Sequence, residues 1–335
     1  MAKELFIKLT PLNSFYFGST KEFGDKNNEY FLKSGLYPQQ TAVLGMLRKK
    51  ILEDNELLLP HTERTKEHRE KEREFIGDIK PNLQDSTFGL IKKVSTVQIY
   101  SNDLPYIFSY GLGKENNFMP NKILTNKGKK RLYNYDYKNF EGKLAGASSN
   151  KELKEFLTSS IEIGINSFKR KNSNIEEKAF FKKERYNFNS SKEYFGFYVS
   201  LDEKVKLKNG VVQLGDKYSI FTMEVFEKKE ERLDINKKFN LKNIIYFLSD
   251  AFLDEEDLKE ILKLSEGILV QNNKFKFISR NEKNERNTAS MQNLVSRGSM
   301  FIIDENKKII NILNNEKYNN YKKIGLNNFE IGGEN

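Results

Sequence analysis

The chain has 335 residues, enough for about two domains, and its net charge at neutral pH is +10. It contains no cysteine, which excludes disulfides, thiolate zinc sites and cysteine nucleophiles. We find neither a membrane-length apolar run nor a secretory segment, and we therefore expect a cytoplasmic protein. The excess of basic residues favours a polyanionic partner such as nucleic acid. The alternative is a solvated, lysine-rich surface that reflects coding bias.

The first predicted elements are a strand over residues 5–9, a loop over 11–38 and a helix over 40–54. Thr41 is the expected N-cap of this helix. The helix is predicted from apolar residues that recur at helical spacing, namely Val43, Leu44, Leu47 and Ile51. Val43, Leu44 and Leu47 are expected to face the core.

Residues 61–74 are almost wholly charged or polar, which is typical of a solvated helix face or a mobile segment. This segment holds the only two histidines, His61 and His68, without the acidic residues that a zinc protease motif requires. No metal site is therefore predicted. A strand is expected within 88–100, an exposed basic loop over 111–135 and a short helix over 151–159.

Residues 161–168 and 179–188 are predicted to be two strands joined by the basic, turn-rich link 169–174. Together they would form a projecting hairpin in which basic and aromatic residues alternate. The remaining predictions are strands at 194–201, 211–214 and 218–226, helices at 241–253 and 254–265, and strands at 268–270, 275–278, 299–303 and 308–313.

This order of elements predicts an α+β fold with mostly antiparallel sheets, and a ferredoxin-like unit at each end fits it. We expect an N-terminal module with long insertions over residues 1–160. The hairpin and a C-terminal module would occupy residues 161–335.

The sequence lacks the common motifs of hydrolytic and transfer enzymes. It has no G-x-S-x-G, no H-E-x-x-H and no P-loop, so no catalytic residue and no cofactor is predicted. A metal-independent ribonuclease that uses Tyr, Lys and Arg stays open as an alternative.

Three segments combine basic and aromatic residues, the mixture that holds single-stranded RNA. They are the loop and helix of 16–50, the hairpin of 166–186, and the stretch Ser296-Arg297-Gly298-Ser299. Adjacent strand residues face opposite sides, so only one of Phe180 and Phe181 can stack on a base. The predicted RNA-binding residues are Phe17, Lys21, Gln39, Gln40, Arg48, Lys49, Asn166, Phe168, Lys169, Arg170, Lys171, Lys182, Lys183, Arg185, Arg297 and Gly298. For Arg48 and Lys49 a solvated helix end is an equal alternative.

Several short motifs occur in a characteristic order along nearly the whole chain. They are Leu9-Thr10-Pro11-Leu12-Asn13-Ser14-Phe15-Tyr16-Phe17, Tyr37-Pro38-Gln39-Gln40-Thr41-Ala42-Val43-Leu44-Gly45-Met46-Leu47-Arg48, Phe88-Gly89-Leu90-Ile91-Lys92-Lys93-Val94-Ser95, Glu162-Ile163-Gly164-Ile165, Phe180-Phe181-Lys182-Lys183, Val212-Gln213-Leu214-Gly215, Arg297-Gly298-Ser299-Met300-Phe301 and Ile324-Gly325-Leu326-Asn327. With these motifs the chain resembles the RAMP superfamily of CRISPR-associated proteins. More narrowly, it resembles the third-named subunit of the type III-B Cmr effector.

The resemblance implies two ferredoxin-like modules and a non-catalytic role. It also implies a subunit that caps the 5′ handle of the guide RNA and contacts the large polymerase- or cyclase-like subunit and the backbone subunits. The family's hairpin thumb maps onto residues 166–188. The family's proline-rich strand is reduced here to Leu104-Pro105-Tyr106. Two other roles stay open, a guide-processing endoribonuclease of the same superfamily and the equivalent subunit of the Csm module.

Overall fold

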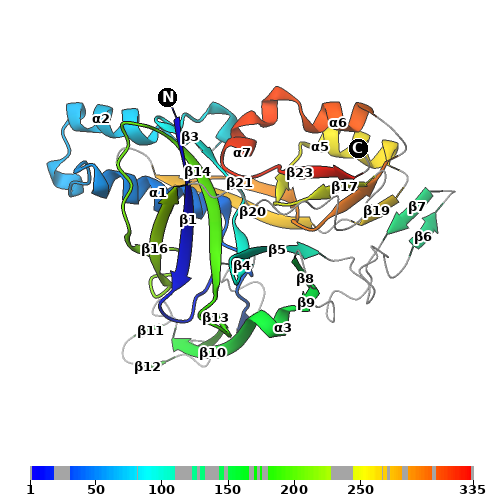
Figure 1. The fold of residues 1–335 in the computed structure, drawn as a ribbon, viewed down its shortest axis with the longest axis horizontal. Coiled ribbons are helices and arrows are strands. Elements are labelled where there is room, and N and C mark those ends of the chain that lie inside the picture. Colours follow the sequence, from blue (N-terminus) through cyan, green and yellow to red (C-terminus); the bar gives the residue numbers. More distant parts are fainter. Residues whose placement is uncertain are drawn as a thin grey trace.

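A computed structural model gives the fold of the chain (Figure 1). The structure describes residues 2–18, 31–80, 82–109, 123–126, 129–132, 143–146, 150–165, 170–171, 174–175, 180–227, 244–265, 267–269, 272–280, 286–303 and 307–332.

A nine-stranded sheet organises the first two thirds of the chain. Its order is β15-β16-β1-β14-β4-β5-β8-β9, with β3 also paired to β14. Its strands are β1 (Ala2–Pro11), β3 (Ile91–Val94), β4 (Gln98–Ser101), β5 (Leu104–Ser109), β8 (Lys143–Gly146), β9 (Asn150–Glu152), β14 (Glu193–Asp202), β15 (Gly210–Gln213) and β16 (Ile220–Glu227). Buried Leu5, Ile7 and Leu9 alternate along β1 with the half-buried Phe6 and Lys8, which confirms the predicted strand. One face of this sheet therefore packs on the core, and we refer to the other as the outer face.

The helix α1 (Gln40–Asp54) packs on the inner face of this sheet and confirms the predicted helix. Its N-cap is Gln39, which makes no side-chain capping bond, so the prediction of Thr41 as N-cap was wrong. The charged segment forms α2 (Lys66–Ile76), with Thr65 accepting a capping bond from the backbone of His68. Two 3₁₀ turns, His61–Glu63 and Leu83–Asp85, flank α2.

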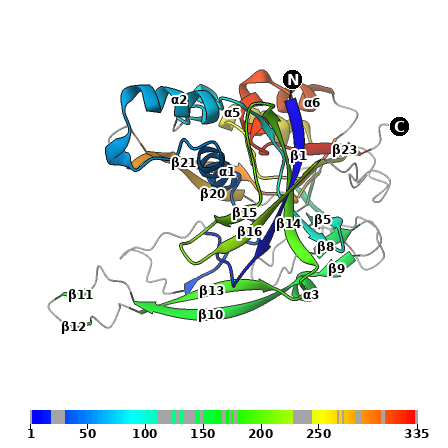
Figure 2. The same cartoon turned by 60° about the vertical axis from the view of Figure 1, so that its left-hand side comes forward.

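The predicted hairpin is confirmed. β10 (Leu157–Ile165) pairs with β13 (Phe180–Phe188) along its whole length, and β2 (Phe31–Leu32) adds to β13 in parallel. The pair extends away from the body toward the short strands β11 (Arg170–Lys171) and β12 (Asn174–Ile175) (Figure 2). The preceding helix, α3 (Leu153–Phe156), is shorter than predicted because the strand begins at Leu157.

The C-terminal third, together with two strands from residues 123–132, forms a second layered unit. A six-stranded sheet has the order β23-β17-β22-β19-β7-β6, and a three-stranded sheet has the order β18-β21-β20. The elements are β6 (Ile123–Asn126), β7 (Lys129–Leu132), β17 (Ile244–Phe247), β18 (Ala251–Phe252), α5 (Glu255–Leu264), β19 (Gly267–Leu269), β20 (Asn272–Arg280), β21 (Arg286–Val295), β22 (Met300–Ile302), α6 (Lys307–Leu313), a 3₁₀ turn (Glu316–Tyr318), α7 (Asn319–Lys323) and β23 (Phe329–Gly332). The fold is thus α+β with mostly antiparallel sheets, as predicted.

Two predictions in this unit were wrong. The segment 308–313 is the helix α6, because Ile309 and Leu313, four residues apart, bury one face. The helix predicted over 241–253 is replaced, within the described residues, by the strands β17, which pairs with β22 and β23, and β18, which pairs with β21. The large sheet pairs β1 with β14, so it contains strands from both sides of residue 160.

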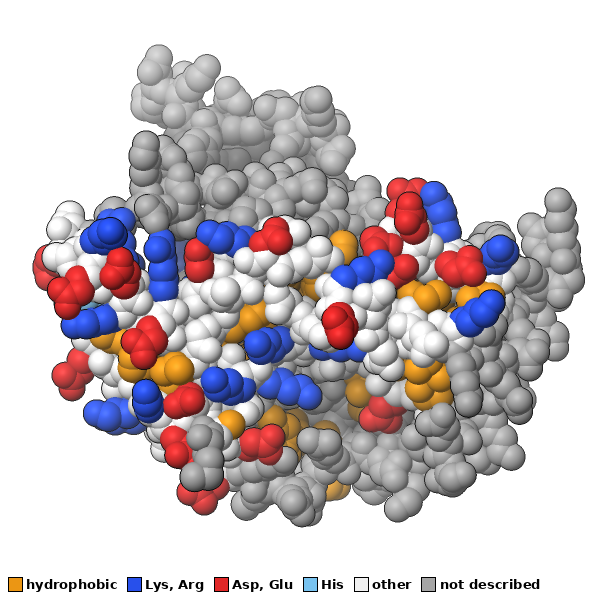
Figure 3. All heavy atoms as spheres, turned by 90° about the horizontal axis from the view of Figure 1, so that it is seen from above, with side chains coloured by type: hydrophobic (Ala, Val, Ile, Leu, Met, Phe, Trp, Pro, Cys, Tyr) orange, Lys and Arg blue, Asp and Glu red, His pale blue; other side chains and the backbone are white. Residues whose placement is uncertain are grey.

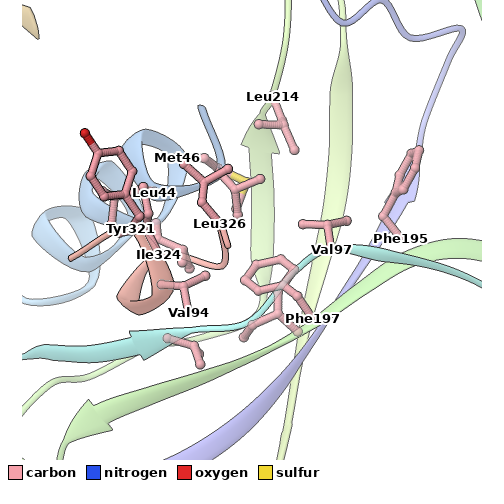
Figure 4. Close-up of a cluster of buried hydrophobic side chains, with 14 of the residues drawn as sticks. Leu44, Met46, Val94, Val97, Phe195, Phe197, Leu214, Tyr321, Ile324 and Leu326 are labelled. Carbon is pink, nitrogen blue, oxygen red and sulfur yellow. The ribbon is translucent and has the colours of Figure 1, made fainter. Parts of the chain in front are cut away.

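The two units share an apolar core. Figure 4 shows Tyr321, Ile324 and Leu326 of the C-terminal segment packed beside Leu44 and Met46 of α1. All five side chains are buried. The C-terminal segment therefore completes the hydrophobic core of the first unit.

The surface seen from above carries acidic and basic side chains interspersed over α2 and its neighbours (Figure 3). This mixture agrees with the prediction of a solvated helix face for the charged segment. Among the described residues, no helix is long and apolar enough to cross a membrane.

Candidate nucleic-acid interface

Arg185 lies at the base of the hairpin, where its side chain is buried. Its guanidinium donates to the carboxylate of Asp216 at 2.7 Å and to the Ser14 carbonyl at 2.6 Å. Lys183 forms an ion pair with the same carboxylate and lies over the ring of Tyr16, 4.1 Å from its centroid. We name Ser14, Lys183, Arg185, Asp216 and Ser219 the hairpin anchor. Through the anchor, the loop between β15 and β16 fixes the base of the hairpin.

Burial opposes ionisation of Asp216, but hydrogen bonds from Arg185, Lys183 and Ser219 outweigh it and lower the pKa of Asp216 to about 2. A depressed carboxyl pKa stabilises the fold at pH above the unfolded value, 3.8. This contribution is lost as the pH falls through about 2.

We therefore expect the difference in free energy of unfolding between the wild type and Asp216→Asn to have its maximum value above about pH 5. Asp216 is then ionised in both the folded and the unfolded states. The difference should shrink steadily toward pH 2. Urea unfolding from pH 6 to pH 2 measures it. A difference that stays constant over this range would contradict the assigned role of Asp216.

A second buried cluster joins the two units of the fold. The Gln40 amide donates to the carbonyls of Ser95 at 3.0 Å and Ile324 at 2.9 Å. Its oxygen accepts from the backbone N–H of Val97 at 3.3 Å. Gln40 therefore connects α1 to the segment before β4 and to the end of α7. Its side chain is 5% exposed, which argues against the predicted RNA contact.

Arg297 connects the same segment from the other side. Its guanidinium donates to the Val97 carbonyl at 2.7 Å and lies 3.7 Å from the centroid of the Tyr37 ring. Its backbone N–H donates to the buried carboxylate of Asp250 at 2.9 Å. Burial raises the pKa of this carboxyl, against the opposing effect of Arg297. We name Gln40, residues 95–98, Arg297 and residues 324–325 the seam.

Gly298 lies in the turn after β21 with φ of 82°, and its N–H donates to the carbonyl of Phe247. The sequence suggested that a glycine here lets another backbone approach closely, and that backbone is the one of β17. The burial of Arg185, Arg297 and Gly298 corrects the expectation that they face RNA. Their polar groups are already bonded within the protein.

Phe17 is 2% exposed and packs against Phe195 and Phe221, with ring centroids 5.5 and 6.2 Å away. Its ring belongs to the core, which corrects the expectation that it stacks on a base. Arg48 donates to the carbonyl of Gly77 at 3.0 Å. Burial lowers the pKa of Arg48 to about 10, with Asp78 and Glu72 acting in the opposite direction. Arg48 therefore connects α1 to the end of α2.

Lys183 and Arg48 are half-buried and are bonded within the protein. Three other predicted contact residues remain at the described surface. Lys49 and Lys182 are exposed, and Gln39 is half-buried. Lys49 lies 4.0 Å from Glu53, within a surface pair that contributes little to stability. Gln39 and Lys49 are about 15 Å apart along the helix axis, so the helix does not bring them together. Lys182 belongs to the hairpin.

The other predicted contact residues have no described side-chain position. Arg170 and Lys171 form β11 at the far end of the hairpin. Four residues lie outside the described part of the chain, namely Lys21, Asn166, Phe168 and Lys169.

Sequence reasoning missed an aromatic cluster on the outer face of the large sheet. Phe6 of β1 lies 5.1 Å from Tyr198 and 5.3 Å from Tyr100, measured between ring centroids. Tyr100 stacks on Tyr194 at 5.2 Å with an interplanar angle of 5°. The alternation of buried residues along β1 indicates that Phe6 points away from the core. The rings around it could not be predicted, because they lie on β4 and β14, which are remote in sequence.

The described residues contain no group of three or more His, Asp or Glu side chains arranged to hold a metal. Nε2 of His68 lies 2.8 Å from the Leu57 carbonyl and 3.4 Å from Glu72. These contacts fix the ring of His68 beside the loop that precedes α2.

The fold has counterparts among solved structures. One chain of a cryo-EM structure of the type III-B Cmr-beta complex bound to cognate target RNA matches with a TM-score of 0.57. The match covers 98% of this chain and 96% of that chain at 15% identity. This chain shares the fold of a Cmr complex chain. A structure of the same complex with target RNA and AMPPnP gives a TM-score of 0.54 at 14% identity, with the same coverage.

A chain of a type III-A Csm3–Csm4 subcomplex gives a TM-score of only 0.34 and adds no support. No protein-family model and no curated protein sequence matches the chain. At these identities the comparison establishes a shared fold, which agrees with the resemblance found in the sequence motifs.

Proposed function

We propose that this chain is a non-catalytic subunit of a type III-B CRISPR effector that binds the 5′ handle of the guide RNA. In this role it contacts the large polymerase- or cyclase-like subunit and the backbone subunits. Each of its two units would be a ferredoxin-like module, and the hairpin β10–β13 would be the thumb that presses on the guide RNA.

The observation that carries the proposal is the fold match to a Cmr-beta chain over 98% of this chain. It extends through the hairpin and both sheets, so it is not a match to one common module. The order of the sequence motifs supports it independently, as does the net charge of +10.

The proposed thumb has the construction that a projecting RNA-binding element requires. Its base is fixed by the hairpin anchor, in which Arg185 is buried, while Lys182, nearer the tip of the hairpin, is exposed. A fixed base positions the exposed cation without the entropy cost of ordering a free loop on binding. The exposed cation then contributes through its charge to a phosphate.

The direct test is to express the full chain with its effector operon and to isolate the complex through a tag on this chain. We expect a bound RNA whose 5′ end is the same in all molecules, because the handle precedes every guide. Absence of RNA from a complex that otherwise assembles would contradict the proposal. Specific cleavage of repeat RNA by the purified chain without metal would instead favour the endoribonuclease alternative.

Lys182→Gln should weaken RNA binding and reduce its salt dependence, because one cation no longer displaces counterions from a phosphate. For single-stranded RNA the slope of log K against log salt should fall by about 0.7. Fluorescence anisotropy with handle RNA at several salt concentrations measures this slope. Lys71→Gln is the control, since Lys71 is 59% exposed on α2 and pairs with Glu67. Equal slopes for both variants would remove Lys182 from the interface.

A further inference from the structure

A cavity of about 310 Å³ opens on the outer face of the large sheet. One side is formed by β3, β4, β5 and β14, and the other by Leu248 and residues 328–330 of the C-terminal unit. The volume is within the range of small organic ligands. Its lining shares no described residue with the hairpin anchor or with the residues predicted to contact RNA, although Arg297 bonds to Gln98 of the lining.

The rings of Tyr100 and Tyr198 line this cavity together with Pro105 and Ile107. Gly196 lets the neighbouring rings lie close to the sheet, because a Cβ there would be 2.5 Å from Tyr100 and 2.6 Å from Phe6. Aromatic and apolar groups gathered in this way favour a flat ligand with a π face.

Two side-chain amides in the lining are oriented by bonds on the protein side. The oxygen of Gln98 accepts from Arg297 at 3.4 Å, which leaves its NH₂ group as a donor. The NH₂ group of Asn328 donates to the hydroxyl of Thr96 at 2.6 Å, which leaves its oxygen as an acceptor. No other described residue bonds these two remaining atoms. A donor and an acceptor beside aromatic rings match the edge and the face of a nucleobase.

The charges of the lining limit what else can bind. Two carboxylates, those of Glu4 and Glu330, and one ammonium group, that of Lys93, belong to the lining. This balance disfavours a polyphosphate inside the cavity, and an uncharged ring is compatible with it. Lys93 is exposed, so it is available to one phosphate.

From these observations we infer that the cavity binds one unpaired nucleobase of the RNA. The inference rests on the proposed function for the source of that base. The tyrosine rings hold its face, the two amides read its edge, and Lys93 contacts an adjoining phosphate.

The test measures binding of handle RNAs in which each nucleotide in turn is replaced by an abasic one. Loss of a stacked base should weaken binding to the full wild-type chain about tenfold or more at one position. Ser200→Phe, which fills the cavity, should weaken binding of the intact RNA and abolish the effect of that abasic position. Val211→Phe is the control, because it adds a ring to the same sheet at an exposed site outside the cavity.

If Ser200→Phe does not fold, Tyr198→Leu can replace it, because this change removes a ring from the lining. RNA binding by Tyr198→Leu should then no longer depend on whether the base at that position is present. Tight RNA binding with no abasic-sensitive position would overturn the inference and leave the proposed function intact. Binding of adenosine 5′-monophosphate in the cavity without competition with RNA would also overturn the inference and leave the proposed function intact. Absence of any RNA binding would overturn both.

Discussion

Replacing Arg185 by alanine should lower the free energy of unfolding by about 3–5 kcal/mol, the cost of breaking a buried ion pair from one side. Among the described residues, the carboxylate of Asp216 would keep only Lys183 and Ser219 as side-chain partners. The carbonyl of Ser14 would lose its 2.6 Å hydrogen bond. Urea denaturation at pH 7 measures the loss. We also expect the hairpin amides to exchange faster in the variant.

The matched control is Lys182→Ala on the same strand. Its exposed side chain should change stability by less than about 0.5 kcal/mol. The double variant Arg185→Ala, Asp216→Ala completes a double-mutant cycle. It should lose clearly less than the sum of the two single variants, since the first change already removes the main partner. Additive losses would show that the two residues act separately and that the hairpin anchor is not a unit.

Replacing Gly325 by alanine should destabilise the protein by about 3 kcal/mol, from backbone strain together with lost hydrogen bonds. Gly325 has φ of 86°, a conformation that favours glycine. A Cβ there would overlap the amide of Gln40 and lie 2.7 Å from the backbone of Ser95. The change would therefore open the seam between the two units. Thermal and urea unfolding measure the effect.

Gly45→Ala gives the opposite expectation and serves as the control. Gly45 lies within α1, and an added Cβ would meet no atom within 4 Å. Alanine should therefore stabilise the helix by about 0.5–1 kcal/mol. If Gly325→Ala were as stable as the wild type, the packing of residues 324–325 against Gln40 would not hold the two units together.

The elements that were predicted correctly are those whose own periodicity decides them. β1 alternates because only one face is buried, and α1 repeats its apolar residues at helical spacing. The hairpin is marked by two strand-like runs around a polar turn. The wrong predictions concern segments in which the apolar run is short. The segment 308–313 has branched residues typical of a strand, yet it packs on the core through one helical face.

The candidate site was harder to predict than the fold. Lys182 and Arg185 belong to one strand and look equivalent in the sequence, but one is exposed and the other is buried against Asp216. The difference arises from a loop more than thirty residues away, since Asp216 lies 31 residues along the chain. Similarly, Gln40 is buried through contact with Ile324, 284 residues away.

The sequence by itself determined the α+β composition, the projecting hairpin, the basic charge and the order of the motifs. These depend on local spacing and composition, which folding does not alter. Only the tertiary structure decided which polar side chains stay available to a partner. Burial of Gln40, Arg185 and Arg297 depends on partners remote in sequence, because buried polar groups require hydrogen bonds that distant segments supply. The outer-face cavity likewise exists only because β4, β14 and the C-terminal segment meet.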